Sequence, residues 1–210
     1  MDDPISLKST EKKVYRSTVA DGLWDIFIGV VVLEFAIAPL LSSRLGDFWS
    51  SVIFLPIWLL VYLAIKIIRK KIITPRIGTV KFGKPRKQKL MRFGIIMVII
   101  NLVIFILGFL VFLYFDHVSG ALIAGIFGLI VMAGFYLAGS MLDYPRLYIY
   151  GSFLLIAPLI GEWLYSFHGA SHHGYPIVFG TSSGLMILIG TITFIRLLKE
   201  HPRIEIPEGA

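Results

Sequence analysis

The chain contains no cysteine and few charged residues, and both absences narrow what it can be. Without cysteine it has neither disulfides nor thiolate metal ligands. Charged residues make up 16% of its 210 residues and hydrophobic ones 57%, which leaves too little polar surface for an ordinary soluble domain. The HExxH, GxSxG and phosphate-loop patterns of common enzymes are also missing. We therefore expect a membrane protein with no resident cofactor, and we favour a non-enzymatic role over that of an integral membrane enzyme.

The apolar residues come in six blocks, each close to the ~20 residues that cross the hydrocarbon core of a bilayer. The blocks are apolar on all sides rather than alternating, which predicts helices and not barrel strands. The predicted spans are 22–41, 50–68, 92–115, 119–140, 147–167 and 175–198. The prediction is an all-α polytopic membrane protein with a polar tail over 1–20, a six-helix domain over 21–200 and a short tail over 201–210.

Basic residues predict the orientation of these spans. If the chain crosses the membrane at each span, 19 of the 20 Lys and Arg residues lie on one side of the membrane and Arg44 lies on the other. Positive charge is retained in the cytoplasm, so both termini and the basic loop over 69–91 are expected there. The net charge of +7 then reflects topology and contact with anionic lipid headgroups. We expect no nucleic-acid partner.

A repeated pattern accompanies the spans. Each even-numbered span is followed by a Pro-Arg-aliphatic triplet, and each odd-numbered span starts near a glycine at a nearly constant distance before the triplet. The triplets begin at Pro75, Pro145 and Pro202, and the glycines are Gly22, Gly94 and Gly151. Prolines after helices and arginines at cytoplasmic edges also arise by coincidence. The near-equal spacing favours three parallel helical hairpins related by an axis along the membrane normal.

Several short motifs resemble a family of uncharacterised prokaryotic integral membrane proteins with six helices. They are Asp21-Gly22-Leu23-Trp24, the PRIGTVKF run over 75–82, the RLYIYG run over 146–151 and the RLLKEHP run over 196–202. The resemblance covers most of the chain. It implies a membrane location and a helical fold, and it brings no catalytic residues with it.

Glu34 is the most informative single residue because it lies near the middle of the first span. A carboxylate is costly there and usually faces a protein interior or a water-filled cavity. Asn101, in the middle of the third span, is the polar residue closest to it in depth. One interpretation is a proton- or cation-coupled site, and the other is a protonated glutamate that hydrogen-bonds between helices.

Two further groups of charged residues occur near the membrane edges. Asp25 lies near the cytoplasmic end of the first span, where Arg76, Arg146 or Arg203 would pair with it. The histidines His117, His168, His172 and His173 are expected on the outer face, close to Glu162. Imidazole and carboxylate suit a divalent transition metal, but a polar interfacial loop is the simpler interpretation of these histidines.

Small residues are frequent in the fourth and sixth spans. Gly120, Gly128, Gly180 and Gly184 are predicted to allow close helix packing, within the chain or in a homo-oligomer. Glu34 and the repeat together favour transport of a small solute or ion, or proton-coupled transport. The alternative is a non-transporting partner, assembly factor or sensor that docks through its basic loop.

Overall fold

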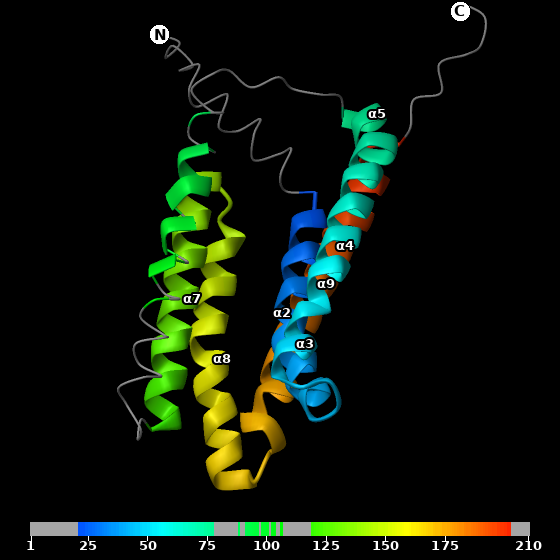
Figure 1. The fold of residues 1–210 in the computed structure, drawn as a ribbon. Helices are drawn as coiled ribbons and strands as arrows, with labels where there is room; N and C mark the ends of the chain where they lie inside the picture. Colours follow the sequence, from blue (N-terminus) through cyan, green and yellow to red (C-terminus); the bar gives the residue numbers. More distant parts are fainter. Residues whose placement is uncertain are drawn as a thin grey trace, which may run out of the picture. The chain divides into compact units, whose positions relative to one another are not determined.

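The computed structural model describes residues 21–77, 88, 91–96, 98–100, 102–103, 106 and 119–202, and the regular elements among them are helical (Figure 1). Five helical stretches in this part of the chain are long and apolar enough to cross a membrane. They are Leu23–Leu45, Asp47–Arg76, Gly120–Leu142, Arg146–His168 and Ser171–Glu200. The predicted helical class is confirmed there. Most of the third predicted span, 92–115, lies outside the described residues.

The chain divides into two compact units, one of residues 1–81 and 179–210 and the other of residues 82–178. In the first unit the elements are α2 (Leu23–Leu45), α3 (Asp47–Val52), α4 (Phe54–Ile68), the π-helical turn η1 (Arg69–Ile73), α5 (Thr74–Ile77) and most of α9 (Tyr175–Glu200). Leu23, Ile65 and Ile73 form a buried apolar cluster, against which Phe27 and Phe194 pack. This cluster joins the start of α2 to the ends of α4 and α9.

Glycines bring α2 and α9 into close contact. A Cβ atom on Gly22 would lie 2.2 Å from the carbonyl oxygen of Gly190, and a Cβ on Gly190 would lie 2.7 Å from that of Gly22. Gly22 also has a φ of 81°, which favours glycine. Farther along α2, a Cβ on Gly29 would lie 3.0 Å from the Ser183 carbonyl. Small residues at membrane-helix contacts allow this approach of two backbones.

The second span is interrupted twice. A single residue, Ile53, separates α3 from α4, three residues before Pro56, which has no N–H to donate to the carbonyl of Val52. At the other end, the amide of Thr74 donates to the carbonyl of Arg69, five residues back, as in a π-helical turn. The helix continues to Ile77, so the first residues of the basic loop predicted over 69–91 are helical.

The second unit contains the hairpin of α7 (Gly120–Leu142) and α8 (Arg146–His168), followed by the 3-10 turn η2 (Ser171–Gly174). Asp143, with a φ of 53°, ends α7. The two helices lie side by side (Figure 1), and a Cβ on Gly128 would lie 2.5 Å from the Leu155 carbonyl oxygen. The turn η2 packs back on α8 at Gly161, whose Cβ would lie 2.7 Å from the His173 carbonyl.

Candidate functional site

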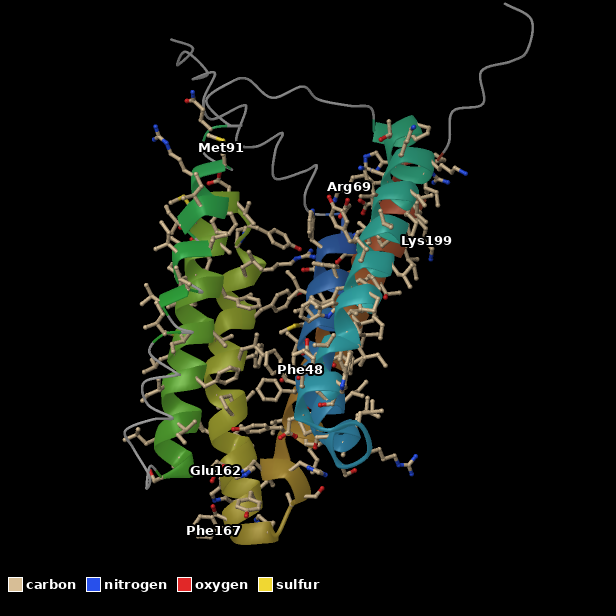
Figure 2. All side chains as sticks on the ribbon, viewed as in Figure 1. Phe48, Arg69, Met91, Glu162, Phe167 and Lys199 are labelled. Atoms are coloured by element: carbon tan, nitrogen blue, oxygen red, sulfur yellow. The ribbon has the colours of Figure 1, made fainter. Side chains whose placement is uncertain are left out.

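An ion pair anchors the start of α2. The Nε and Nη2 groups of Arg69 both donate to Oδ2 of Asp21, the first over 3.0 Å, and the Leu23 amide donates to Oδ1 over 3.0 Å. The same guanidinium lies over the Trp24 ring, 5.7 Å from its centroid, where a cation is attracted to the aromatic face. Figure 2 shows Arg69 at this end of the first unit. Burial raises the pKa of Asp21 above its usual value, although Arg69 acts in the opposite direction.

Asp25, one turn farther along α2, is fully buried. Of the arginines predicted to pair with it, Arg76 donates from Nη1 to the carbonyls of Leu198, over 3.0 Å, and His201, over 3.1 Å. Arg146 is the first residue of α8, and Arg203 lies outside the described residues. The predicted pairing of Asp25 therefore stays a prediction. What the structure adds is Arg69, which the sequence did not single out.

Glu34 lies about 16 Å along α2 from Leu23, at 1.5 Å per residue. It is partly buried, and within the described residues its carboxylate has no hydrogen-bond or ion-pair partner. Its predicted neighbour Asn101 lies outside the described residues. Helical periodicity of 3.6 residues places Glu34 on the same stripe of α2 as Leu23 and Phe27, which pack toward α4. The packing face toward α9, at Gly22 and Gly29, is a different one.

The stripe of α4 that faces α2 contains a buried polar atom. Ile65 belongs to the shared core, and Tyr62 lies with its ring centroid 6.3 Å from that of Phe27. Trp58 is one turn before Tyr62 on this stripe. Its indole Nε1 is buried and is the one such side-chain atom in the described part of the chain that lacks a hydrogen-bond partner. A buried N–H without a partner is costly, so this atom requires an explanation.

The second unit has a polar cluster of its own, near the label of Glu162 in Figure 2. The side chain of Glu162 is 11% exposed, and its Oε2 is 2.8 Å from Nδ1 of His173. Gly120, the first residue of α7, leaves room for it, since a Cβ there would lie 2.1 Å from Oε1. The carboxylate thus occupies the positive end of α7, which favours an anion. The His173 ring lies 4.3 Å from the Tyr165 ring.

The predicted histidine ligands do not converge in the described residues. No group of three or more His, Asp or Glu side chains suited to a metal is found in that part of the chain. His173 is bound to Glu162, and the ring of His168 meets that of Trp163 edge to face with centroids 4.7 Å apart. His172 has a φ of 51°, and His117 lies outside the described residues. A divalent-metal site on this face stays a prediction.

The four glycines predicted for helix packing have different surroundings. Gly120 lies against Glu162, and Gly128 against the backbone of Leu155. Among the described residues of other turns and helices, a Cβ on Gly180 would meet the Cβ of Ala36 at 3.8 Å, and a Cβ on Gly184 would meet no atom within 4 Å. The α2–α9 contact is closer at Gly22, Gly29 and Gly190. None of these three glycines belongs to a GxxxG pattern.

Comparisons with known proteins found no relative. No family model, no curated protein and no solved structure matches the chain. The resemblance of its motifs to a prokaryotic membrane-protein family stays a prediction, and the function is inferred from the residues of the chain itself.

Proposed function

We propose that the chain is an integral protein of the cell membrane that transports a small solute or ion, or works by proton-coupled transport, with Glu34 as the residue that carries the coupling. The supporting observation is the position of this carboxylate. It lies in the middle of an apolar helix, on the stripe facing α4, with no partner among the described residues. An ionisable group in the membrane is expensive and is found mainly where it has a function.

The topology that we propose has six spans, with both termini in the cytoplasm. Arg76 bonds to carbonyls at the end of α9, so the basic ends of the second and last spans lie on one side, while Arg44 is at the far end of α2. That arrangement agrees with retention of basic residues in the cytoplasm. The sixth helix would be formed by residues 92–115.

Contacts of equivalent glycines support the proposal of three hairpin repeats. Gly22, at the start of the first span, lies against Gly190 of α9. Gly151, its counterpart in the fifth span, lies against α7, where a Cβ would be 2.8 Å from the Cβ of Phe135. In both cases the first helix of one hairpin lies against the second helix of another: the first span against the sixth, and the fifth span against the fourth. A parallel repeat would produce the same contact again.

Lipid is the partner that the surface supports. Lys66, Lys70, Lys71 and Lys199 are exposed at the basic end of the first unit, with Lys199 labelled in Figure 2. Each Lys near an anionic leaflet adds attraction of about 1 kcal/mol. We propose that these residues contact anionic headgroups and that the exposed apolar faces contact lipid tails or a second copy of the chain. No nucleic-acid contact is proposed.

The transport proposal is tested by flux through purified protein in liposomes. A potassium gradient with a potassium ionophore sets the membrane potential, and an enclosed pH-sensitive dye reports proton movement. We expect flux in the wild type and at least a tenfold loss in Glu34→Gln, because the amide cannot exchange a proton. Glu200→Gln, which changes an exposed helical ion pair with Arg196, is the matched control. Equal flux in wild type and Glu34→Gln, or none in either, would reject this role for Glu34.

A further inference from the structure

Two side chains of complementary chemistry lie at one level of the α2–α4 interface. The contacts between Asp21 and Arg69 and between Phe27 and Tyr62 show that the two helices run in opposite directions. Counting along both helices from these contacts, the residue of α4 level with Glu34 is close to Pro56. Trp58 is within one turn of that level, and its side chain leans toward the start of its own helix.

Both side chains lie on the stripes that face the opposite helix. On α2 the stripe runs through Leu23 and Phe27 to Glu34, and on α4 it runs from Ile65 through Tyr62 to Trp58. The Trp58 indole offers a buried N–H donor that has no acceptor among the described residues. Glu34 offers an acceptor that has no donor there. A buried donor without an acceptor and a partly buried carboxylate without a donor are thus placed by helical periodicity on the same interface.

We propose that Glu34 and Trp58 form one intramembrane proton site, in which the indole N–H of Trp58 donates to the ionised carboxylate of Glu34 through a bridging water. Trp58 acts as a positioning residue: it stabilises the anion that is ready to accept the next proton. When a proton arrives as a hydronium ion, the carboxylate oxygen takes it and leaves a neutral water, and the hydrogen bond from the indole weakens. The inference deepens the transport proposal and rests on it for the biological role of the site.

The chemistry of the pair selects a proton rather than a metal cation. A tryptophan N–H only donates hydrogen bonds. Its partially positive hydrogen points toward the carboxylate, and it supplies no oxygen ligand for a metal ion. Calcium takes six to eight oxygen ligands, and magnesium demands a near-ideal octahedral set. One carboxylate next to an N–H donor does not meet that demand. A proton needs only the carboxylate oxygen, which the donor leaves available.

The experiment observes Trp58 directly while Glu34 is titrated. The full chain is labelled with 5-fluorotryptophan, and its four tryptophans give fluorine resonances that single Trp→Phe variants assign. Infrared absorption of the protonated carboxyl, identified by its loss in Glu34→Gln, follows Glu34 itself. We expect the Trp58 resonance to shift with pH in step with this band, and to be insensitive to pH in Glu34→Gln. Trp49, which is exposed, is the control resonance.

The variant Trp58→Phe gives an independent measurement. Loss of the donor destabilises the anion, so the proton affinity of Glu34 should rise about tenfold, as expected for a hydrogen bond to a charged group. Trp49→Phe should leave it unchanged. A Trp58 resonance that ignores pH while Glu34 titrates, or one that responds equally to added sodium at fixed pH, overturns the inference. Coupled titration without liposome flux would reject the transport proposal alone, and flux that needs Glu34 without this coupling would reject the inference alone.

Discussion

Asp21 is the residue where burial and ion pairing act against each other. Its carboxylate is 1% exposed and is bound by Arg69 and by the Leu23 amide. Removing water from a carboxylate disfavours its charge, whereas a guanidinium favours it. Burial has the larger effect here, and the pKa of Asp21 is raised from its usual value of 3.8.

A raised pKa predicts how stability changes with pH. The folded state binds the Asp21 proton more tightly than the unfolded state, so the free energy of unfolding falls as pH rises above 3.8 and levels off once the folded state has lost the proton. Melting in detergent between about pH 4 and about pH 7 should show this fall in the wild type and less of it in Asp21→Asn. Asp47→Asn, at an exposed site, is the control. An identical pH slope in all three proteins would contradict the prediction.

The buried carboxylate of Glu162 leads to a second prediction, about the stability of the fold. Glu162→Gln keeps the shape of the side chain but removes the charge that His173 and the start of α7 stabilise. A hydrogen bond to a charged group is worth about 1.5–3 kcal/mol, and we expect a loss of stability near the lower figure. Glu200→Gln, in an exposed pair, should cost less than about 0.5 kcal/mol. Chemical denaturation in detergent measures both, and equal losses would argue against the buried cluster.

The sequence identified which charged residues are energetically costly to bury, but it identified few of the residues that bind them. Glu34 stands out because a carboxylate in an apolar block is rare whatever surrounds it. Arg69 was hidden among other basic residues, because nothing local distinguishes the one arginine that folds back onto Asp21. Trp58 was missed for a similar reason, since an indole in an apolar span is ordinary until its N–H is found buried without an acceptor.

Helices α2 and α9 cross closely because the residues at their contact, Gly22 and Gly190, have no side chains. Gly190→Ala would place a methyl group 2.7 Å from the Gly22 carbonyl oxygen. The helices would have to separate, at a cost of about 1–3 kcal/mol. Gly184→Ala is on the same helix, and its added Cβ would meet no atom of another element within 4 Å among the described residues, so it should be neutral or slightly stabilising. The two melting temperatures in detergent test this, and equal values would contradict the crossing.

Hydropathy predicted the long helices well and their interruptions poorly. The spans predicted over 119–140 and 147–167 correspond to α7 and α8, because length and apolarity are set by the bilayer. The break at Ile53 and the π-helical turn at Arg69–Ile73 depend on single hydrogen bonds. Pro56 is a signal for the break in the sequence, because it has no N–H to donate. The pattern of apolar residues is the same whether an amide donates four residues back or five, so the π-helical turn had no signal in the sequence.

For the whole molecule, the absence of cysteine makes the proposed topology easy to test. Single cysteines at two exposed positions, Ser171→Cys and Lys70→Cys, introduce the only thiols in the chain. In intact cells a membrane-impermeant thiol reagent should label Ser171→Cys, and it should label Lys70→Cys only after the membrane is opened. Basic residues are retained inside, whereas the histidine-bearing turn is proposed to lie outside. Labelling of both positions from one side would exclude an odd number of crossings between them.

The five-residue reach from Thr74 to Arg69 also works as a spacer. An α-helix turns by about 100° per residue, and the wide turn spreads one extra residue over nearly the same arc. Deleting Lys70 would therefore convert it to a regular turn and leave the residues after it facing as before. The guanidinium of Arg76 should keep the Leu198 and His201 carbonyls, and Asp21 should keep Arg69, whereas a one-residue deletion in the regular part of α4 should separate the two contacts.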